Sequence, residues 1–170
     1  MPLIGVSIAV PDPCGPELQG YRVSLGDDEA HLIPTHITLL PPTDLADRHL
    51  DDVVAHLDAA AGSLERFSIH LRGTGTFRPV SPVVFVNLVE GISECELVAK
   101  SVCSGPLEVN LEFPYHPHVT IAHHRPAEIL DRAFDELAGF ECEFEVREFL
   151  LYVFDDGAGW VPQRAFRLVE

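Results

Sequence analysis

Two short segments, far apart in this chain, carry the same pattern of side chains. The first contains His36 and Thr38, the second contains His118 and Thr120, and the residues between and after them are apolar. On a strand, residues i and i+2 point to one face, so each segment presents an imidazole beside a hydroxyl and buries its aliphatic side chains opposite. Either segment alone is a common half-buried polar pair. Their repetition predicts two strands at equivalent places in two similar halves.

The rest of the chain alternates between strand and helix patterns. Apolar residues at helical spacing predict a helix over 50–64, and β-branched runs bounded by Pro or Gly predict strands. The segment 14–25 is ambiguous, and a short helix around 17–23 is one interpretation. The other expected elements are strands over 3–10, 35–40, 67–71, 83–89, 117–122, 144–154 and 160–169, and helices over 93–103 and 126–137.

This order predicts the fold class. The second half of the chain repeats the alternation of the first, and no proline-rich linker separates them. We therefore expect an α+β fold with mostly antiparallel sheets flanked by helices. The expected organisation is one domain over 1–170, with lobes of roughly 1–90 and 91–170 that leave room for an exchange of strands.

The charge of the chain limits its partners. Its 170 residues include 27 acidic and 11 basic side chains, which gives a net charge of −16. Long duplex nucleic acid and anionic membranes need a dense basic surface, so we exclude both and expect only a local basic pocket for a small anion. No apolar run could span a membrane, and residues 1–5 show no basic secretory leader, so the expected location is the cytoplasm.

The four cysteines give no sign of a shared site. Cys14, Cys95, Cys103 and Cys142 include no CxxC pair. In a protein without a secretion signal, this pattern favours reduced and mostly buried thiols over disulfides or a metal site.

The paired HxTx motifs resemble those of the 2H phosphoesterase superfamily, which includes 2′-5′ RNA ligases and 2′,3′-cyclic phosphodiesterases. The segments 77–79 (FRP) and 115–118 (YHPH) are also similar to bacterial members. The resemblance covers most of the chain. It implies two pseudo-symmetric lobes with an active-site cleft between them, and phosphodiester hydrolysis or transfer that requires no metal or other cofactor.

The resemblance also implies a role for each motif residue. His36 is the general base, His118 is the general acid, and Thr38 and Thr120 hold phosphate oxygens. The residue types suit this chemistry, because an imidazole titrates near pH ~6.5 and one neutral ring can coexist with one protonated ring near neutrality. The near-symmetry of the two motifs leaves the reverse order of acid and base open.

The cation that binds the phosphate has several candidates. Ligase-like members often carry Arg about five residues after the second motif histidine, where this chain has His123. Arg125 or His123 could replace that Arg, or Arg78 could reach in from the other half. For any single Arg, an ordinary surface side chain is the slightly favoured interpretation.

Aromatic residues near the motifs have two interpretations. Tyr115 and Phe113 precede the second motif, and Phe77 precedes the FRP arginine. Such residues can stack on a base at the mouth of a cleft, but packing in the core or a lid is more common. Trp160 is expected in the core.

The leading hypothesis is a metal-independent phosphoesterase that cleaves a 2′,3′-cyclic phosphate or a 2′-5′ bond in a nucleotide or short RNA end. One alternative is a nucleotide- or RNA-end-binding module without turnover, and another is a cyclic phosphodiesterase of a non-nucleotide metabolite. A metal site at His116, His123 and His124 is a further alternative, although Pro117 interrupts the first pair and no acid or Cys stands at ligand spacing nearby. We expect a monomer.

Overall fold

The computed structural model describes residues 3–45 and 49–170. Met1 and Pro2, the first residues of the segment examined for a secretory leader, lie outside the described residues. The α-helices are α1 (Cys14–Ser24), α2 (Leu50–Gly62), α3 (Ile92–Val102) and α4 (Ala127–Glu136), and two 3-10 turns are η1 (Ala30–Leu32) and η2 (Gly105–Leu107). The strands are β1 (Leu3–Ala9), β2 (His36–Asp44), β3 (Phe67–Thr76), β4 (Val83–Glu90), β5 (His118–His123), β6 (Glu141–Val146), β7 (Glu148–Asp155) and β8 (Gly159–Arg167).

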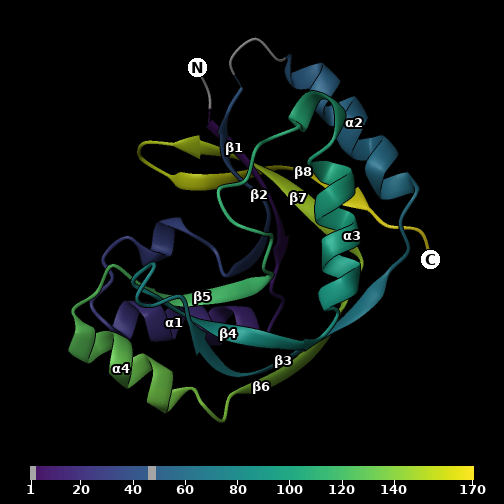
Figure 1. Cartoon of the computed structure of the whole chain (residues 1–170). Helices are drawn as coiled ribbons and strands as arrows, with labels where there is room; N and C mark the ends of the chain where they lie inside the picture. Colours follow the sequence, from purple (N-terminus) through teal and green to yellow (C-terminus); the bar gives the residue numbers. More distant parts are fainter. Residues whose placement is uncertain (1–2, 46–48) are drawn as a thin grey trace.

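The strands form two four-stranded sheets (Figure 1). The first sheet has the order β2-β1-β7-β8 and the second the order β5-β4-β3-β6, and every pairing between these strands is antiparallel. Helices α2 and α3 pack against the first sheet, and α1 and α4 against the second. The α+β prediction with antiparallel sheets is confirmed.

The two sheets are not built from the two halves of the sequence. The first sheet takes its strands from the two ends of the chain, and the second takes four strands from the middle. The prediction of one continuous strand over 144–154 is therefore wrong. β6 ends at Val146, and β7 begins at Glu148 in the other sheet. The alternation of buried residues changes phase there, from Cys142 and Val146 to Phe149 and Leu151. This change marks the point where the chain leaves one sheet for the other.

The two motif strands lie side by side at the centre of the molecule. β2 is an edge strand of the first sheet, β5 is an edge strand of the second, and the two are in contact. Each begins at its motif histidine, His36 or His118. The topology thus brings together two segments that are far apart in the sequence.

A disulfide corrects the expectation of reduced thiols. Cys14, the first residue of α1, is bonded to Cys142 on β6, the far edge of the second sheet from β5. Cys95 and Cys103 are free, as expected. The sequence could not reveal the pair, because only the packing of α1 on the second sheet brings together residues separated by 128 positions.

Among the described helices, none combines the length and apolar character required to cross a bilayer.

Candidate active site

A cleft between the two sheets brings both motifs together. It has a volume of about 790 Å³ and is lined by His36 and Thr38 from β2 and by His118 and Thr120 from β5. Residues of β1, β7 and β8 complete one wall, and the segments before β4 and β5 complete the other. As the i, i+2 spacing predicts, each His–Thr pair faces the cleft while the residue between them is buried.

The two motif histidines are held in the same way. Nδ1 of His36 lies 2.6 Å from the carbonyl oxygen of Pro34, and Nδ1 of His118 lies 2.7 Å from that of His116. A carbonyl oxygen only accepts hydrogen bonds, so each neutral ring carries its proton on Nδ1 and leaves Nε2 unprotonated. Nε2 of neither ring has a hydrogen-bond partner among the described residues. Each Nε2 can therefore accept a proton, or donate one once the ring is charged.

Burial lowers the pKa of both histidines below the ordinary value of 6.5, because desolvation disfavours the imidazolium form. The bond to Pro34 partly offsets this effect on the pKa of His36, and the charge of Arg22 lowers that pKa further. For His118, the bond to His116 raises the pKa, while the charges of His116 and His36 lower it. The two motif rings thus interact electrostatically, and the proton on one depends on the proton on the other.

Two phenylalanines account for the burial of His118. The ring of Phe77 stands nearly perpendicular to the imidazole, with centroids 4.9 Å apart, and the ring of Phe85 lies at 5.2 Å. These edge and tilted contacts keep water from the ring. Phe77 therefore packs against a motif histidine, while Phe113, 59 % exposed, lines the mouth of the same cleft.

Tyr115 connects the two motifs. Its hydroxyl donates a hydrogen bond of 2.7 Å to the backbone carbonyl of Thr38, and its ring lines the cleft. Burial raises the pKa of this phenol, so Tyr115 stays protonated and keeps its donor role. The segment leading into β5 is thereby tied to β2.

The three candidate cations for the phosphate differ in whether they line the cleft. His123 lines the cleft, and burial, together with the charges of His124 and Arg22, lowers its pKa. Arg78 and Arg125 do not line it. Arg78 donates hydrogen bonds to Asp131 at 2.8 Å and to Thr76 at 3.1 Å. Arg125 donates to the carbonyl of Gly26 at 2.8 Å and so supports the turn after α1.

Arg22 is the cleft cation that the sequence analysis missed. It lies in the last turn of α1, is only 4 % exposed and lines the same cleft as the motif histidines. Its spacing from Leu18 and Leu25, at positions i, i+4 and i+7, places it on the buried face of a helix. That spacing was the available signal, and the ambiguity of segment 14–25 concealed it.

Trp160 is also placed differently from its prediction. It is half-buried and lines the cleft rather than sitting in the core. Its ring lies over β1 at Gly5, where an added Cβ would come within 3.4 Å of Cζ3. Glycine at this position leaves room for the indole to form part of the cleft wall.

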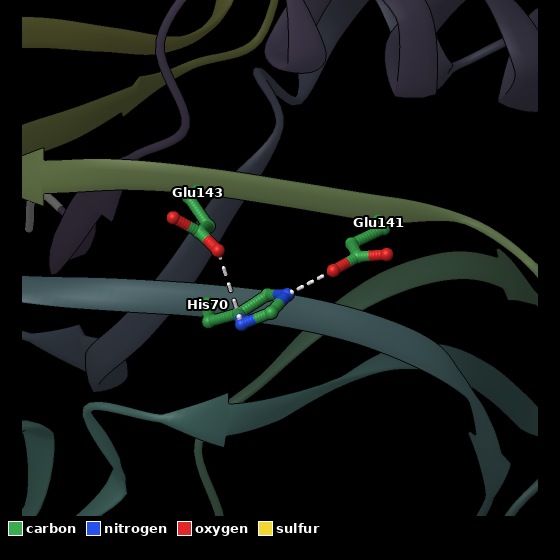
Figure 2. Close-up of side chains that lie close together, drawn as sticks. All are labelled: His70, Glu141 and Glu143. Atoms are coloured by element: carbon green, nitrogen blue, oxygen red, sulfur yellow. Dashed lines mark hydrogen bonds and ion pairs between the residues drawn. The ribbon is translucent and has the colours of Figure 1, made fainter.

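A group that could hold a metal lies outside the cleft. Figure 2 shows His70 of β3 between Glu141 and Glu143 of β6, with Nε2 at 2.7 Å from Glu141 and Nδ1 at 3.4 Å from Glu143. It is the only such group of three ligands found among the described residues, and its ligand atoms lie within 4.8 Å of one another. His116, His123 and His124 do not form one.

The sequence profile of the 2′-5′ RNA ligase superfamily matches residues 10–158, most of the chain. The chain belongs to this superfamily. The resemblance carried by the paired motifs is therefore confirmed, and with it membership in a superfamily of phosphoesterases and RNA ligases.

Similar proteins from several bacteria agree with this membership of the 2′-5′ RNA ligase superfamily. A Bacillus thuringiensis (strain Al Hakam) protein named "Putative phosphoesterase" is 31% identical over 149 residues, covering 84% of this chain and 83% of its own. TT0787 of Thermus thermophilus superposes with a TM-score of 0.69 at 20% identity, covering 99% of this chain and 98% of its own. E. coli LigT complexed with 3′-AMP gives 0.62 at 19% identity, covering 100% of both chains. The two structures show a common fold.

Proposed function

We propose that this protein is a metal-independent phosphoesterase that cleaves 2′,3′-cyclic phosphates, or 2′-5′ phosphodiester bonds, of nucleotides or short RNA ends. The observation that carries the proposal is the matched pair of histidines. Both line one cleft, both are anchored through Nδ1 to the carbonyl of residue i−2, and both leave Nε2 available. One ring on each side of a bound phosphate suits in-line displacement, in which one removes a proton and the other supplies one.

In this proposal, His36 is the general base and His118 the general acid. A base must be neutral before the reaction, and the charge of Arg22 lowers the pKa of His36 and so favours its neutral form. Nε2 of His36 takes the proton of the attacking water, and Nε2 of His118 gives a proton to the leaving ribose oxygen. Thr38 and Thr120, one on each strand, donate hydrogen bonds to the phosphate oxygens without adding negative charge.

The substrate class follows from the size and charge of the cleft. A cleft of about 790 Å³ accommodates a nucleotide, and Trp160, Tyr115 and Phe113 offer aromatic surface for a base. The LigT structure complexed with 3′-AMP supports a nucleotide ligand in this fold. All of these residues come from one chain, so we propose that a monomer, with the two sheets as lobes of one domain, carries the complete site.

Turnover of the four 2′,3′-cyclic nucleotides in excess EDTA tests the proposal. Wild-type protein should hydrolyse at least one of them, and His36→Ala and His118→Ala should each lower kcat by about 10²–10⁴-fold, the usual contribution of a positioned acid or base. Chromatography of the product would identify the P–O bond that breaks. Activity lost in EDTA and restored by zinc would contradict the metal-free mechanism.

The roles of the two histidines can be separated with an aryl ester. Thymidine 5′-(4-nitrophenyl phosphate) releases nitrophenolate, which needs no proton from a general acid. His118→Ala should therefore lose much less activity on this ester than on the cyclic nucleotide, while His36→Ala should lose activity on both. The opposite result would exchange the two roles. Binding of 3′-AMP by a wild-type protein that turns over neither substrate would instead indicate a binding module.

A further inference from the structure

Arg22 has an unusual environment for an arginine. Its side chain belongs to α1, yet only 4 % of the residue is exposed, and what surrounds it is the wall of the cleft. Its charge contributes to lowering the pKa of His36 and of His123, two other residues that line the cleft. A buried guanidinium is costly unless its donors are matched.

The hydrogen bonds of Arg22 are incomplete. Nη2 donates to Oδ2 of Asp27 at 3.1 Å, and Asp27 is itself held by the backbone N–H of Glu29 at 3.2 Å. Nε is buried and has no hydrogen-bond partner among the described residues. Because a guanidinium carries five N–H donors in a planar fork, Arg22 keeps the capacity to bind an anion while Asp27 fixes its position.

The described residues give the cleft one permanently charged cation. Among the described residues that line the cleft, Arg22 is the only Arg or Lys, and Glu112 is the only acid. The chain as a whole carries a net charge of −16. An anionic ligand in the cleft therefore meets one fixed positive charge within an acidic protein.

We propose that Arg22 is the cation of the phosphate subsite and that, as the only Arg or Lys among the described residues of the cleft, it limits the ligand to a single phosphate group. The proposal rests on the phosphoesterase function above, since it names the residue that holds the reacting phosphate of that site. Arg22 binds an oxygen of the phosphate through its free donors, and Asp27 acts as the positioning residue. A second phosphate on the same ligand meets no second Arg or Lys among the described cleft residues and is repelled by the net negative charge of the protein.

The proposal is tested by calorimetric binding of 3′-AMP and of adenosine, which differs only in lacking the phosphate. Arg22→Gln should weaken 3′-AMP binding by about 10- to 100-fold, since hydrogen bonds to charged groups are strong, and should leave adenosine binding unchanged. Arg22→Lys should give an intermediate loss, because it keeps the charge but not the fork. Arg164→Gln, which alters an exposed arginine paired with Asp58, is the matched control and should change neither affinity.

Two results would overturn the subsite. One is equal weakening of 3′-AMP and adenosine, which would mean that Arg22 only shapes the cleft, and the other is no weakening of either. If Arg22→Gln does not fold, as judged by its thermal transition, Arg22→Lys carries the same comparison. These binding measurements need no turnover, so an inactive wild type that loses 3′-AMP affinity on substitution would refute the phosphoesterase function and leave the subsite intact.

The limit to one phosphate is tested by comparing a ligand with two phosphate groups against 3′-AMP. Adenosine 3′,5′-bisphosphate should bind wild-type protein no more tightly than 3′-AMP, because the second phosphate meets no second cation. Tenfold tighter binding of the bisphosphate would overturn this part of the proposal.

Discussion

The environment of each motif histidine determines when it can act. Desolvation lowers the pKa of His36 and of His118 below 6.5, and the charges of Arg22 and His116 add to this effect at one ring each. At neutral pH the free protein therefore holds mostly neutral rings. That state suits the base, but it leaves the acid without its proton. In the proposed mechanism, catalysis therefore requires that His118 is protonated while His36 is not.

The rate should therefore depend on pH in a bell-shaped manner with an acidic maximum. As pH falls, His36 becomes protonated and kcat/KM drops; as pH rises through the lowered pKa of His118, the acid loses its proton and kcat/KM drops again. The maximum should lie below about pH 6.5, the ordinary value for histidine. His116→Asn removes a charge that lowers the pKa of His118, so the alkaline limb should move to higher pH. A maximum above about pH 7.5 would exclude this pair as the acid and base in these roles.

For individual residues, the sequence predicts the placement of side chains that recur at a regular spacing. It does not predict the placement of single side chains that belong to no repeated pattern. The i, i+2 spacing of His and Thr was enough to place all four motif side chains on the cleft. Arg78 and Arg125 were candidates because of their nearness to motifs in sequence, which does not report where a long side chain finds its partner. Arg22 stands in no motif: its helical spacing indicates a buried face, and the approach of α1 to the cleft shows what that face borders.

Among the elements, α1 carries a covalent constraint of long range. Its first residue is bonded to Cys142 on one edge of the second sheet, and its packing extends to β5 on the other edge. The disulfide thus anchors the helix whose last turn carries Arg22. The sequence predicts strands and helices well where a β-branched run or helical spacing of apolar residues is clear, as in β4 and α2. It fails at β6 and β7, where the strand pattern continues across a change of sheet.

Loss of this disulfide should destabilise the fold. A cross-link between residues 128 positions apart restricts the unfolded chain, and removal of a disulfide typically costs about 2–4 kcal/mol of unfolding free energy. Urea unfolding with and without dithiothreitol should show this difference. The Cys14→Ser/Cys142→Ser double variant should match the reduced protein and should not respond to the reductant. An equal response of wild type and variant to dithiothreitol would show that the bond does not contribute to stability.

The whole molecule is acidic, and its cleft is a local exception. The protein has a net charge of −16, and the described residues that line the cleft include one Arg and no Lys. We therefore expect each phosphate beyond the first to add repulsion rather than contact. The fold class follows from the sequence at this scale, whereas the distribution of strands between the sheets does not, because it depends on pairings between distant segments.

Varying the length of the RNA substrate tests whether phosphates beyond the first add repulsion. For RNA oligomers ending in a 2′,3′-cyclic phosphate, kcat/KM should fall as the chain lengthens at low salt, with the mononucleotide as reference. Added salt should reduce the difference, since the screening length shortens to about 10 Å at 0.1 M. A rise of kcat/KM with length would reveal an RNA-binding surface and contradict the expected preference for small substrates.

The bond between Cys14 and Cys142 also divides the chain into a ring and two tails. The ring contains α1, β2, β3, β4, β5 and the first two residues of β6, and the tails contain β1 on one side and the rest of β6 with β7 and β8 on the other. In the oxidised protein, a protease that cuts once within the ring releases no fragment, whereas a cut in either tail detaches strands of the first sheet. Both motif histidines and Arg22 belong to the ring, so a single nick there leaves them in one covalent piece.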